Sequence, residues 1–178
     1  MRVIAGTARS MPLITPKGEG TRPTTDRIKE TLFNILQCDV PGAVFCDFFA
    51  GSGGIGIEAL SRGAKHAYFV DNNKEALDCI KKNIAFTKMT DKATVISRDV
   101  RDAIFEIHDM ADIVFMDPPY SQGLEFDIMQ MLKNSKFVNE DTLIIIEADI
   151  ETEIAHDAFE IVKNKRYKNN QHIFMYKK

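Results

Sequence analysis

Apolar runs alternate with segments of helical periodicity from residue 43 to residue 148, and no other feature of the chain constrains its fold as strongly. Strands that alternate with helices form βαβ units, whose strands lie parallel in a sheet covered on both faces. The expected strands are residues 43–49, 66–71, 92–97, 112–117 and 142–148. The expected helices between them are residues 54–63, 73–88, 102–108 and 125–134.

Two hairpins are expected to flank this alternating region. Residues 2–5 and 11–15 are short β-like runs around "GTARS" and predict a small N-terminal hairpin. Residues 159–168 and 171–178 predict a closing antiparallel hairpin at the other end of the chain.

One more helix is expected before the first strand. The stretch "PTTD" at residues 23–26 is a helix start signal, because Thr and Asp cap helices and Pro is tolerated at their first turn. Apolar residues then recur at helical spacing at Ile28, Leu32, Ile35 and Leu36.

Together these elements predict an α/β fold with a mostly parallel, seven-stranded, doubly wound sheet and helices on both faces. Residues 1–20 are expected to form a β-hairpin extension and residues 21–178 the main domain. In such sheets ligands bind beyond the carboxyl ends of the strands, where the strand order reverses. The predicted site therefore lies in the loops that follow residues 49, 71, 97 and 117.

The composition is typical of a soluble globular protein, with 44% hydrophobic and 28% charged residues. No apolar run approaches the roughly 20 residues that span a bilayer, so no membrane association is expected. The three cysteines, Cys38, Cys46 and Cys79, are scattered and form no C-x-x-C pair. They are interpreted as reduced, mostly buried thiols, and no metal site is expected.

Basic residues are concentrated at the two ends of a chain whose net charge is −3. Residues 1–18 and 161–178 contain Lys and Arg and no acid. This distribution fits a local surface for a phosphate backbone. Exposed hairpins also carry lysine for solubility and edge protection, and charge alone does not decide between the two interpretations.

A glycine-rich turn follows the first strand of the alternating region. The stretch "DFFAGSGGIGIEAL" places Gly51, Gly53 and Gly56 in a G-x-G-x-x-G spacing between a strand and a helix. Glycine permits positive φ and a close approach of the backbone to a ligand. The same spacing also occurs in tight turns that bind nothing, so this motif indicates a ligand only together with its neighbours.

A second signal is Asp71, which ends the next strand twenty positions after Gly51. A carboxylate at this place can accept both hydroxyl groups of a ribose. Its alternative role is to cap the next helix, which Asn72 or Asn73 could equally do. The glycine turn and the spaced acid together favour a nucleoside ligand.

Two further acids bear on the kind of nucleoside. Asp47 lies inside the first strand, where an unpaired carboxylate is costly and a cationic ligand would compensate it. S-adenosylmethionine carries an ammonium and a sulfonium and no phosphate, whereas a dinucleotide would seat its phosphates on the glycine turn. Asp99 follows the third strand and could contact an adenine amino group or cap the following helix.

The most specific signal is "DPPY", Asp117 to Tyr120, at the end of the fourth strand. The Asp117 carboxylate and the Pro118 carbonyl can accept the hydrogens of an exocyclic base amine, whose lone pair is otherwise delocalised into the ring. Prolines fix φ and supply no N–H, so the loop is rigid and offers only acceptors. Tyr120 can stack on a base taken out of its helix. The alternative is a proline turn that merely ends a strand.

The stretches "DFFAGSGGIGIEAL", "FVDNN" and "DPPY", in this order, resemble class I S-adenosylmethionine-dependent methyltransferases that act on exocyclic amines. The stretches "MRVIAG", "TPKGEGTRPTTDRIKETLFNIL" and "FFAGSGGIGIEALSRGA" resemble the RsmD family of bacterial methyltransferases acting on guanine N2 of small-subunit ribosomal RNA. The resemblance covers essentially the whole chain. It implies a Rossmann-like fold, S-adenosylmethionine as cofactor, and guanine 966 of 16S rRNA in a partly assembled ribosomal subunit as substrate. It further implies a cytoplasmic monomer.

The resemblance also implies roles for individual residues. The implied cofactor-binding residues are Asp47, Gly51, Ser52, Gly53, Gly56, Asp71, Asn72, Asp99 and Val100. The implied catalytic residues are Asp117, Pro118, Pro119 and Tyr120. The implied substrate-binding residues are Arg2, Arg9, Arg22 and Arg27.

Four other functions share some of these sequence features. A DNA adenine-N6 methyltransferase shares the amine-directed chemistry but usually carries a sizeable target-recognition domain. A protein-glutamine methyltransferase typically has Asn where this chain has Asp117. A nicotinamide-dependent oxidoreductase could use the glycine turn but would have no use for "DPPY", and a non-catalytic RNA-binding module leaves the acids at the strand ends unexplained.

Overall fold

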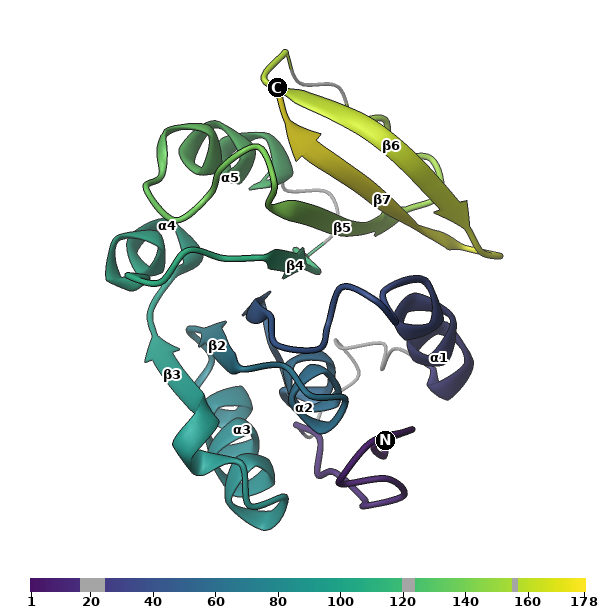
Figure 1. The fold of residues 1–178 in the computed structure, drawn as a ribbon, viewed down its shortest axis with the longest axis vertical. Helices are drawn as coiled ribbons and strands as arrows, with labels where there is room; N and C mark the ends of the chain where they lie inside the picture. Colours follow the sequence, from purple (N-terminus) through teal and green to yellow (C-terminus); the bar gives the residue numbers. More distant parts are fainter. Residues whose placement is uncertain (17–24, 120–123, 155–156) are drawn as a thin grey trace.

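A single seven-stranded sheet forms the centre of the molecule (Figure 1). The computed structural model describes residues 1–16, 25–119, 124–154 and 157–178. The strands lie in the order β3-β2-β1-β4-β5-β7-β6. Their bounds are β1 Val44–Phe48, β2 His66–Asp71, β3 Ala93–Ser97, β4 Ile113–Met116, β5 Leu143–Asp149, β6 Phe159–Arg166 and β7 Asn170–Lys177. The predicted α/β, Rossmann-like fold is confirmed.

Strands β1 to β5 are parallel, and β7 is inserted antiparallel between β5 and β6. The order of strands reverses between β1 and β4, which is where open α/β sheets bind their ligands. The predicted closing hairpin is therefore confirmed, with β7 rather than β6 joined to the parallel strands. No described helix is both long enough and apolar enough to cross a membrane.

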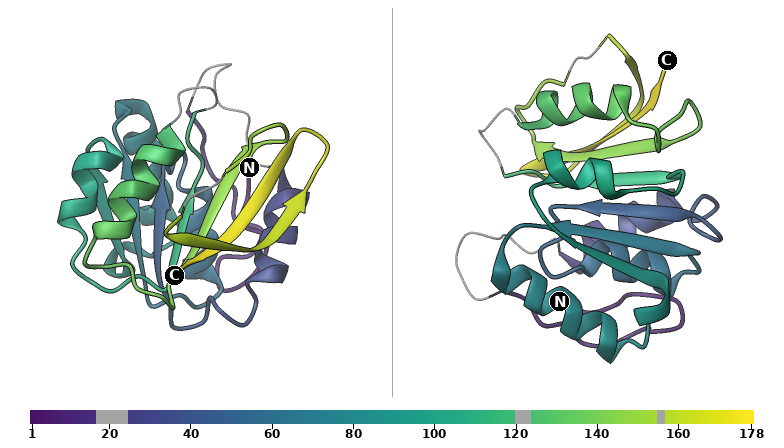
Figure 2. Two further views of the ribbon diagram at one scale, coloured as in Figure 1. Left: turned by 90° about the horizontal axis from the view of Figure 1, so that it is seen from above. Right: turned by 90° about the vertical axis from the view of Figure 1, so that its left-hand side faces the viewer.

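Helices pack on both faces of the sheet (Figure 2). Their bounds are α1 Asp26–Ile35, α2 Gly54–Ser61, α3 Lys74–Phe86, α4 Val100–Ala103 and α5 Leu124–Asn134, with short 3-10 helices at Thr90–Lys92 and Ile104–Glu106. The expected helix at residues 102–108 is thus a single α-helical turn followed by a 3-10 turn.

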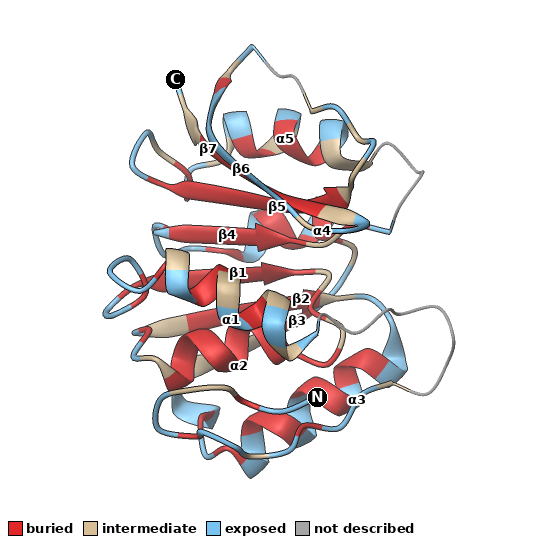
Figure 3. Cartoon of the chain, turned by 90° about the vertical axis from the view of Figure 1, so that its right-hand side faces the viewer, coloured by how far each residue is buried: buried red, intermediate tan, exposed pale blue. Residues whose placement is uncertain are grey.

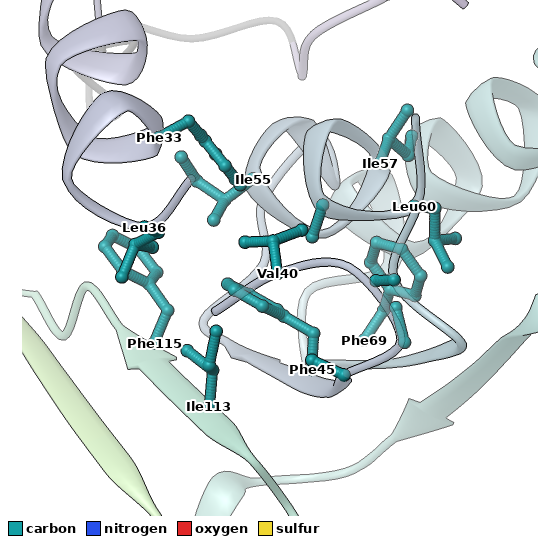
Figure 4. Close-up of a cluster of buried hydrophobic side chains, with 14 of the residues drawn as sticks. Phe33, Leu36, Val40, Phe45, Ile55, Ile57, Leu60, Phe69, Ile113 and Phe115 are labelled. Carbon is teal, nitrogen blue, oxygen red and sulfur yellow. The ribbon is translucent and has the colours of Figure 1, made fainter. Parts of the chain in front are cut away.

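Two hydrophobic cores result, one on each face of the sheet. Helices α1, α2 and α3 bury Phe33, Ile57 and Ile80 against Phe45 and Phe115 of the sheet, part of which Figure 4 shows. The second core lies between the other face and helices α4 and α5. Because both faces are covered, all residues of β1 and β4 are buried. This burial explains the nearly continuous apolar runs in the sequence.

Strand β6 is largely exposed, because it forms an open edge of the sheet (Figure 3). Its residues after Phe159 are all exposed, and they include Lys163, Lys165 and Arg166. The register of β6 against β7 shifts between Ile161 and Lys163, as in a β-bulge.

Helix α1 begins at the predicted position but turns a different face to the core. Thr25 is its N-cap, and the Thr25 side chain accepts a hydrogen bond from the Ile28 amide. The buried positions are Lys29, Leu32, Phe33 and Leu36, while Ile28 and Ile35 are only half-buried. The helix is therefore rotated by about one residue from the predicted face, because the Lys29 ammonium finds a partner inside the protein.

That partner is Glu58 of α2, a fully buried carboxylate that joins three parts of the chain. Its Oε2 lies 3.2 Å from the Lys29 Nζ and its Oε1 accepts a hydrogen bond from the Arg62 Nε at 2.8 Å. It also accepts hydrogen bonds from the backbone amides of Ile4 and Ala5 at 2.8 and 3.0 Å. Burial lowers the pKa of Lys29, and the nearby Glu58 carboxylate acts in the opposite direction.

The N-terminal segment differs from the predicted hairpin. Its two expected strands are reduced to one antiparallel bridge between Arg2 and Pro12. The reason is that Glu58 and Ser61 of α2 take up backbone groups that would otherwise continue a ladder. The segment also buries Val3 in the core of α1 to α3. The predicted domain boundary at residue 20 lies outside the described residues.

Glu58→Ala is expected to destabilise the protein by about 3–5 kcal/mol, because it leaves the buried Lys29 ammonium without its counter-ion and two backbone amides without their acceptor. Urea unfolding of both variants measures this difference. The matched control is Glu30→Ala, which removes an exposed carboxylate from α1 and should cost less than about 1 kcal/mol. A loss below about 1 kcal/mol for Glu58→Ala would contradict this account of the N-terminal segment.

Candidate active site

Carboxylates from three strands meet on one face of the sheet at its carboxyl edge. Side chains alternate along a strand, so residues two positions apart share a face. Asp47, Asp71 and Asp117 each follow by two residues a phenylalanine of the α1 to α3 core, namely Phe45, Phe69 and Phe115. The three acids therefore lie on the face that carries α2 and the glycine turn, beside the reversal of strand order.

The glycine turn has the conformation that its sequence predicts. Gly51 and Gly53 have φ of +57° and +75°, values that side chains other than glycine rarely adopt. A Cβ added at Gly51 would meet only the Phe49 oxygen at 4.0 Å, so open space adjoins this residue. A Cβ at Gly56 would instead lie 2.4 Å from the Phe69 ring. Gly51 thus leaves room for a ligand, whereas Gly56 allows α2 to pack closely on β2.

Ser52 lies in the same turn and is buried. Its backbone oxygen accepts a hydrogen bond from the Asn83 side chain of α3, which also bonds both backbone groups of Ile14. The Ser52 hydroxyl lies 3.3 Å from the Met1 sulfur. The N-terminal segment therefore packs directly against the predicted cofactor turn.

Asp71 accepts hydrogen bonds from the glycine turn and from the N-cap residue of the helix that follows it. Its Oδ2 accepts the Gly51 amide and its Oδ1 the Asn73 amide, both at 2.8 Å. Asn73 itself is the N-cap of α3, and Asn72 is exposed. Asn73 therefore caps the helix, and Asp71 remains partly exposed at the strand end.

Asp47 is buried at the centre of the site. Its Oδ2 accepts the amide of Gly56 at 2.8 Å, so the first turn of α2 is fixed to β1. Burial raises the pKa of Asp47 to about 8, against the effect of that hydrogen bond, and the charge of Asp71 acts in the same direction as burial. A cationic ligand would favour the charged form of this carboxyl group.

Asp99 serves as the N-cap of α4. It accepts the Arg101 amide at 3.0 Å and the Arg101 Nε at 2.8 Å. The hydrogen bond from the Arg101 side chain lowers the pKa of Asp99. The side chain of Val100 is buried in the core of α4 and α5. Of the two predicted roles of Asp99, capping is the one that the structure shows.

Asp117 begins the loop after β4, partly buried, and its amide is hydrogen-bonded to the Phe48 oxygen at 3.4 Å. Burial, followed by the negative charges of Glu147 and Asp47, raises the pKa of Asp117 well above its ordinary value. Pro118 is buried and Pro119 is exposed. The predicted stacking residue, Tyr120, lies outside the described residues.

Glu147 and His172, which are not among the predicted site residues, are buried next to this site. Glu147 ends an apolar run in the same way as Asp117, and that signal could have identified it. His172 carried no such signal, since β7 brings it to Glu147 from 25 residues away.

Three of the four predicted substrate-binding arginines, Arg2, Arg9 and Arg27, lie in the described part of the chain and are exposed. Arg2 forms an exposed pair with Asp26 at 2.8 Å, and Arg9 and Arg27 are exposed. Arg2 and Arg9 line one small pocket of about 220 Å³. Arg22 lies outside the described residues. A larger apolar pocket of about 700 Å³, which Phe105 and Met131 help to line, contains none of the predicted site residues.

Known proteins resemble this chain over most of its length. A family model described as conserved hypothetical protein 95 matches residues 1–177. The ribosomal RNA small subunit methyltransferase D of Escherichia coli is 35% identical over 151 residues, which are 85% of this chain and 76% of that protein. The YlbH protein of Bacillus subtilis is 35% identical over 172 residues, 93% of this chain and 92% of that protein. The solved structure of the Escherichia coli protein yhhF matches with a TM-score of 0.87 and 30% sequence identity. The match covers 100% of this chain and 98% of the yhhF chain.

Asp47→Asn is expected to stabilise the ligand-free protein at pH 8 by on the order of 5 kcal/mol. The carboxyl group has a higher pKa in the folded than in the unfolded chain, so its contribution to stability is full below pH 3.8 and is lost as the pH rises toward about 8. Asparagine can still accept the Gly56 amide. The melting temperatures of both proteins, measured between pH 4 and pH 8, check this prediction. A difference in melting temperature that does not change with pH would contradict it.

Proposed function

The chain belongs to the RsmD family, and on that premise we propose that it transfers a methyl group from S-adenosylmethionine to the exocyclic N2 amine of a guanine in small-subunit ribosomal RNA. The observation that carries the proposal is Asp117, followed by two prolines, on the same face of the sheet as Asp47 and Asp71. The proposed target is guanine 966 of 16S rRNA in a partly assembled subunit, as in the family that the chain resembles.

The glycine turn and its acids fit S-adenosylmethionine. Gly51 adjoins open space, and Asp71 presents a partly exposed carboxylate beside it for the ribose hydroxyls. Asp47 is a buried carboxyl group that a cation would charge, which suits the ammonium end of this cofactor. When bound, the cofactor supplies an electrophilic methyl group on a sulfonium.

Asp117 and Pro118 are proposed to hold the amine. Two oxygen acceptors on a rigid, donor-free loop orient the N–H bonds and leave the nitrogen lone pair directed away from them. The Asp117 charge also stabilises the positive charge that develops on the nitrogen during the reaction.

The RNA is proposed to approach over the N-terminal segment and the start of α1. Arg2, Arg9 and Arg27 are exposed there, and arginine suits phosphate contacts. Such a substrate would place the protein in the cytoplasm, and we propose that it acts as a monomer.

Mass-spectrometric mapping of methylated guanines tests the proposed substrate. Purified small ribosomal subunits and naked DNA are incubated separately with the protein and labelled cofactor. One methylated guanine N2 in the ribosomal RNA is expected. Methylated adenine in the DNA, with unmodified RNA, would favour the DNA adenine-N6 alternative instead.

Asp117→Ala is expected to lower the rate of methyl transfer by about 1,000-fold, because the amine loses its charged acceptor. Cofactor affinity, measured by calorimetry, should change less than twofold. The control is Asp141→Ala, an exposed carboxylate just before β5 at the opposite edge of the sheet. Transfer at the wild-type rate by Asp117→Ala would show that the catalytic assignment is wrong.

Asp71→Ala is expected to weaken cofactor binding by about 10- to 100-fold, because the ribose hydroxyls lose their hydrogen bonds to a charged group. Calorimetric titration with S-adenosylmethionine measures it. Asp78→Ala, which removes an exposed carboxylate from α3, should bind normally. Unchanged affinity in the folded Asp71 variant would remove Asp71 from the ribose role.

A further inference from the structure

A cluster of hydrogen-bonded polar side chains lies next to Asp117. Glu147 of β5 accepts a hydrogen bond from the Asn170 Nδ2 at 2.5 Å, and its Oε2 lies 3.1 Å from the His172 Nε2. The Tyr167 hydroxyl is 3.2 Å from the other ring nitrogen of His172. His172 is fully buried and Glu147 is 4% exposed. Both oxygens of this carboxylate are therefore engaged within the protein.

The sheet register places this cluster beside Asp117. Strands β4 and β5 pair Met116 with Ile146, so Asp117 and Glu147 occupy the next level of adjacent strands, which lie about 4.8 Å apart. Glu147 in turn pairs with His172 on β7. The His172 ring packs edge-on against Phe115, two residues before Asp117, with centroids 5.9 Å apart. Asp117, Glu147 and His172 thus form a row across three neighbouring strands on one face.

One tautomer of His172 satisfies both of its ring contacts. With a proton on Nε2, the ring donates to Glu147, and its Nδ1 accepts a hydrogen bond from the Tyr167 hydroxyl. Glu147 then accepts hydrogen bonds from two donors, the Asn170 side chain and the His172 ring. A contribution to stability does not by itself explain this buried polar cluster, because well-packed apolar side chains in its place often give a core that is equally or more stable.

Glu147 acts electrostatically on Asp117. Burial, then Glu147, then Asp47 raise the pKa of Asp117. In the described part of the chain, the titratable groups on this side of Asp117 are Asp47 on β1 and Glu147 on β5, with His172 and Tyr167 behind Glu147. A carboxylate in these surroundings binds a proton more strongly than an ordinary aspartate does.

We propose that Glu147, held by Asn170 and His172, is a positioning residue that makes Asp117 the acceptor of the proton released by the substrate amine. In this step an N–H bond of the amine breaks, its electron pair stays on nitrogen, and the proton forms an O–H bond with Asp117. The inference rests on the proposed function and adds to it the proton acceptor and the residue that sets its strength.

Glu147→Gln tests this directly, because glutamine keeps the size and one acceptor but not the charge. The kcat on small ribosomal subunits is expected to fall about 100-fold, with KM and cofactor affinity unchanged within twofold. Without the neighbouring negative charge Asp117 loses its proton more readily, so the acidic limb of the kcat profile moves down by about one pH unit. Glu151→Gln, which removes an exposed carboxylate four residues away, is the control and should leave the profile unchanged.

Asn170→Ala provides a second test at a half-buried position where the fold is less at risk. It removes one of the two donors to Glu147, and kcat is expected to fall about 10-fold at constant KM. An unshifted acidic limb in Glu147→Gln, or a full kcat in Asn170→Ala, would overturn the inference.

A titration of the Asp117 carboxyl carbon by NMR separates this inference from the proposed function, because it needs no substrate. The midpoint is expected to be lower in Glu147→Gln than in the wild type. An unchanged midpoint overturns the role of Glu147, whatever the activity. Failure of the wild-type protein to methylate ribosomal subunits, with a shifted midpoint, overturns the proposed function alone.

Discussion

The two-residue alternation of side chains along a buried strand is the constraint on which the rest of this structure depends. In each of four parallel strands the last core residue on the α1 to α3 face is followed, two positions later, by an acid. The pairs of core residue and acid are Phe45 and Asp47, Phe69 and Asp71, Phe115 and Asp117, and Ile145 and Glu147. A shift of one strand by a single residue would turn its acid into the opposite core. The packing that holds the sheet thus also aligns the chemistry.

Acids gathered at one edge repel each other, and the surrounding structure offsets this by supplying donors. Backbone amides of the glycine turn and of the first turn of α2 bind Asp71 and Asp47. The Asn83 side chain holds the glycine turn in place, because it donates hydrogen bonds to the backbone oxygens of both Ser52 and Ile14. Glu58 fixes the N-terminal segment over the same helix. Stability and site geometry are therefore coupled through α2, the helix that starts at the glycine turn.

Much of the fold and of the site follows from local sequence. Apolar runs identified the five parallel strands, and the glycine spacing identified the turn at Gly51. Two features did not follow, because they depend on contacts between distant residues. Lys29 is buried only because Glu58 stands opposite it, which no helical periodicity reveals. Glu147 meets His172 only because β7 runs antiparallel between β5 and β6, an order that the two hairpin runs by themselves do not specify.

The open edge at β6 has a consequence for how molecules of this protein meet one another. An exposed strand presents unpaired amide and carbonyl groups to which a second sheet can add, and Ile161 and Val162 offer it apolar side chains. The bulge between Ile161 and Lys163 interrupts the regular spacing that such an addition needs, and the lysines on either side of Asn164 would meet like charges from an identical edge. The final hairpin therefore protects the protein against edge-to-edge aggregation at the high concentrations of a cell.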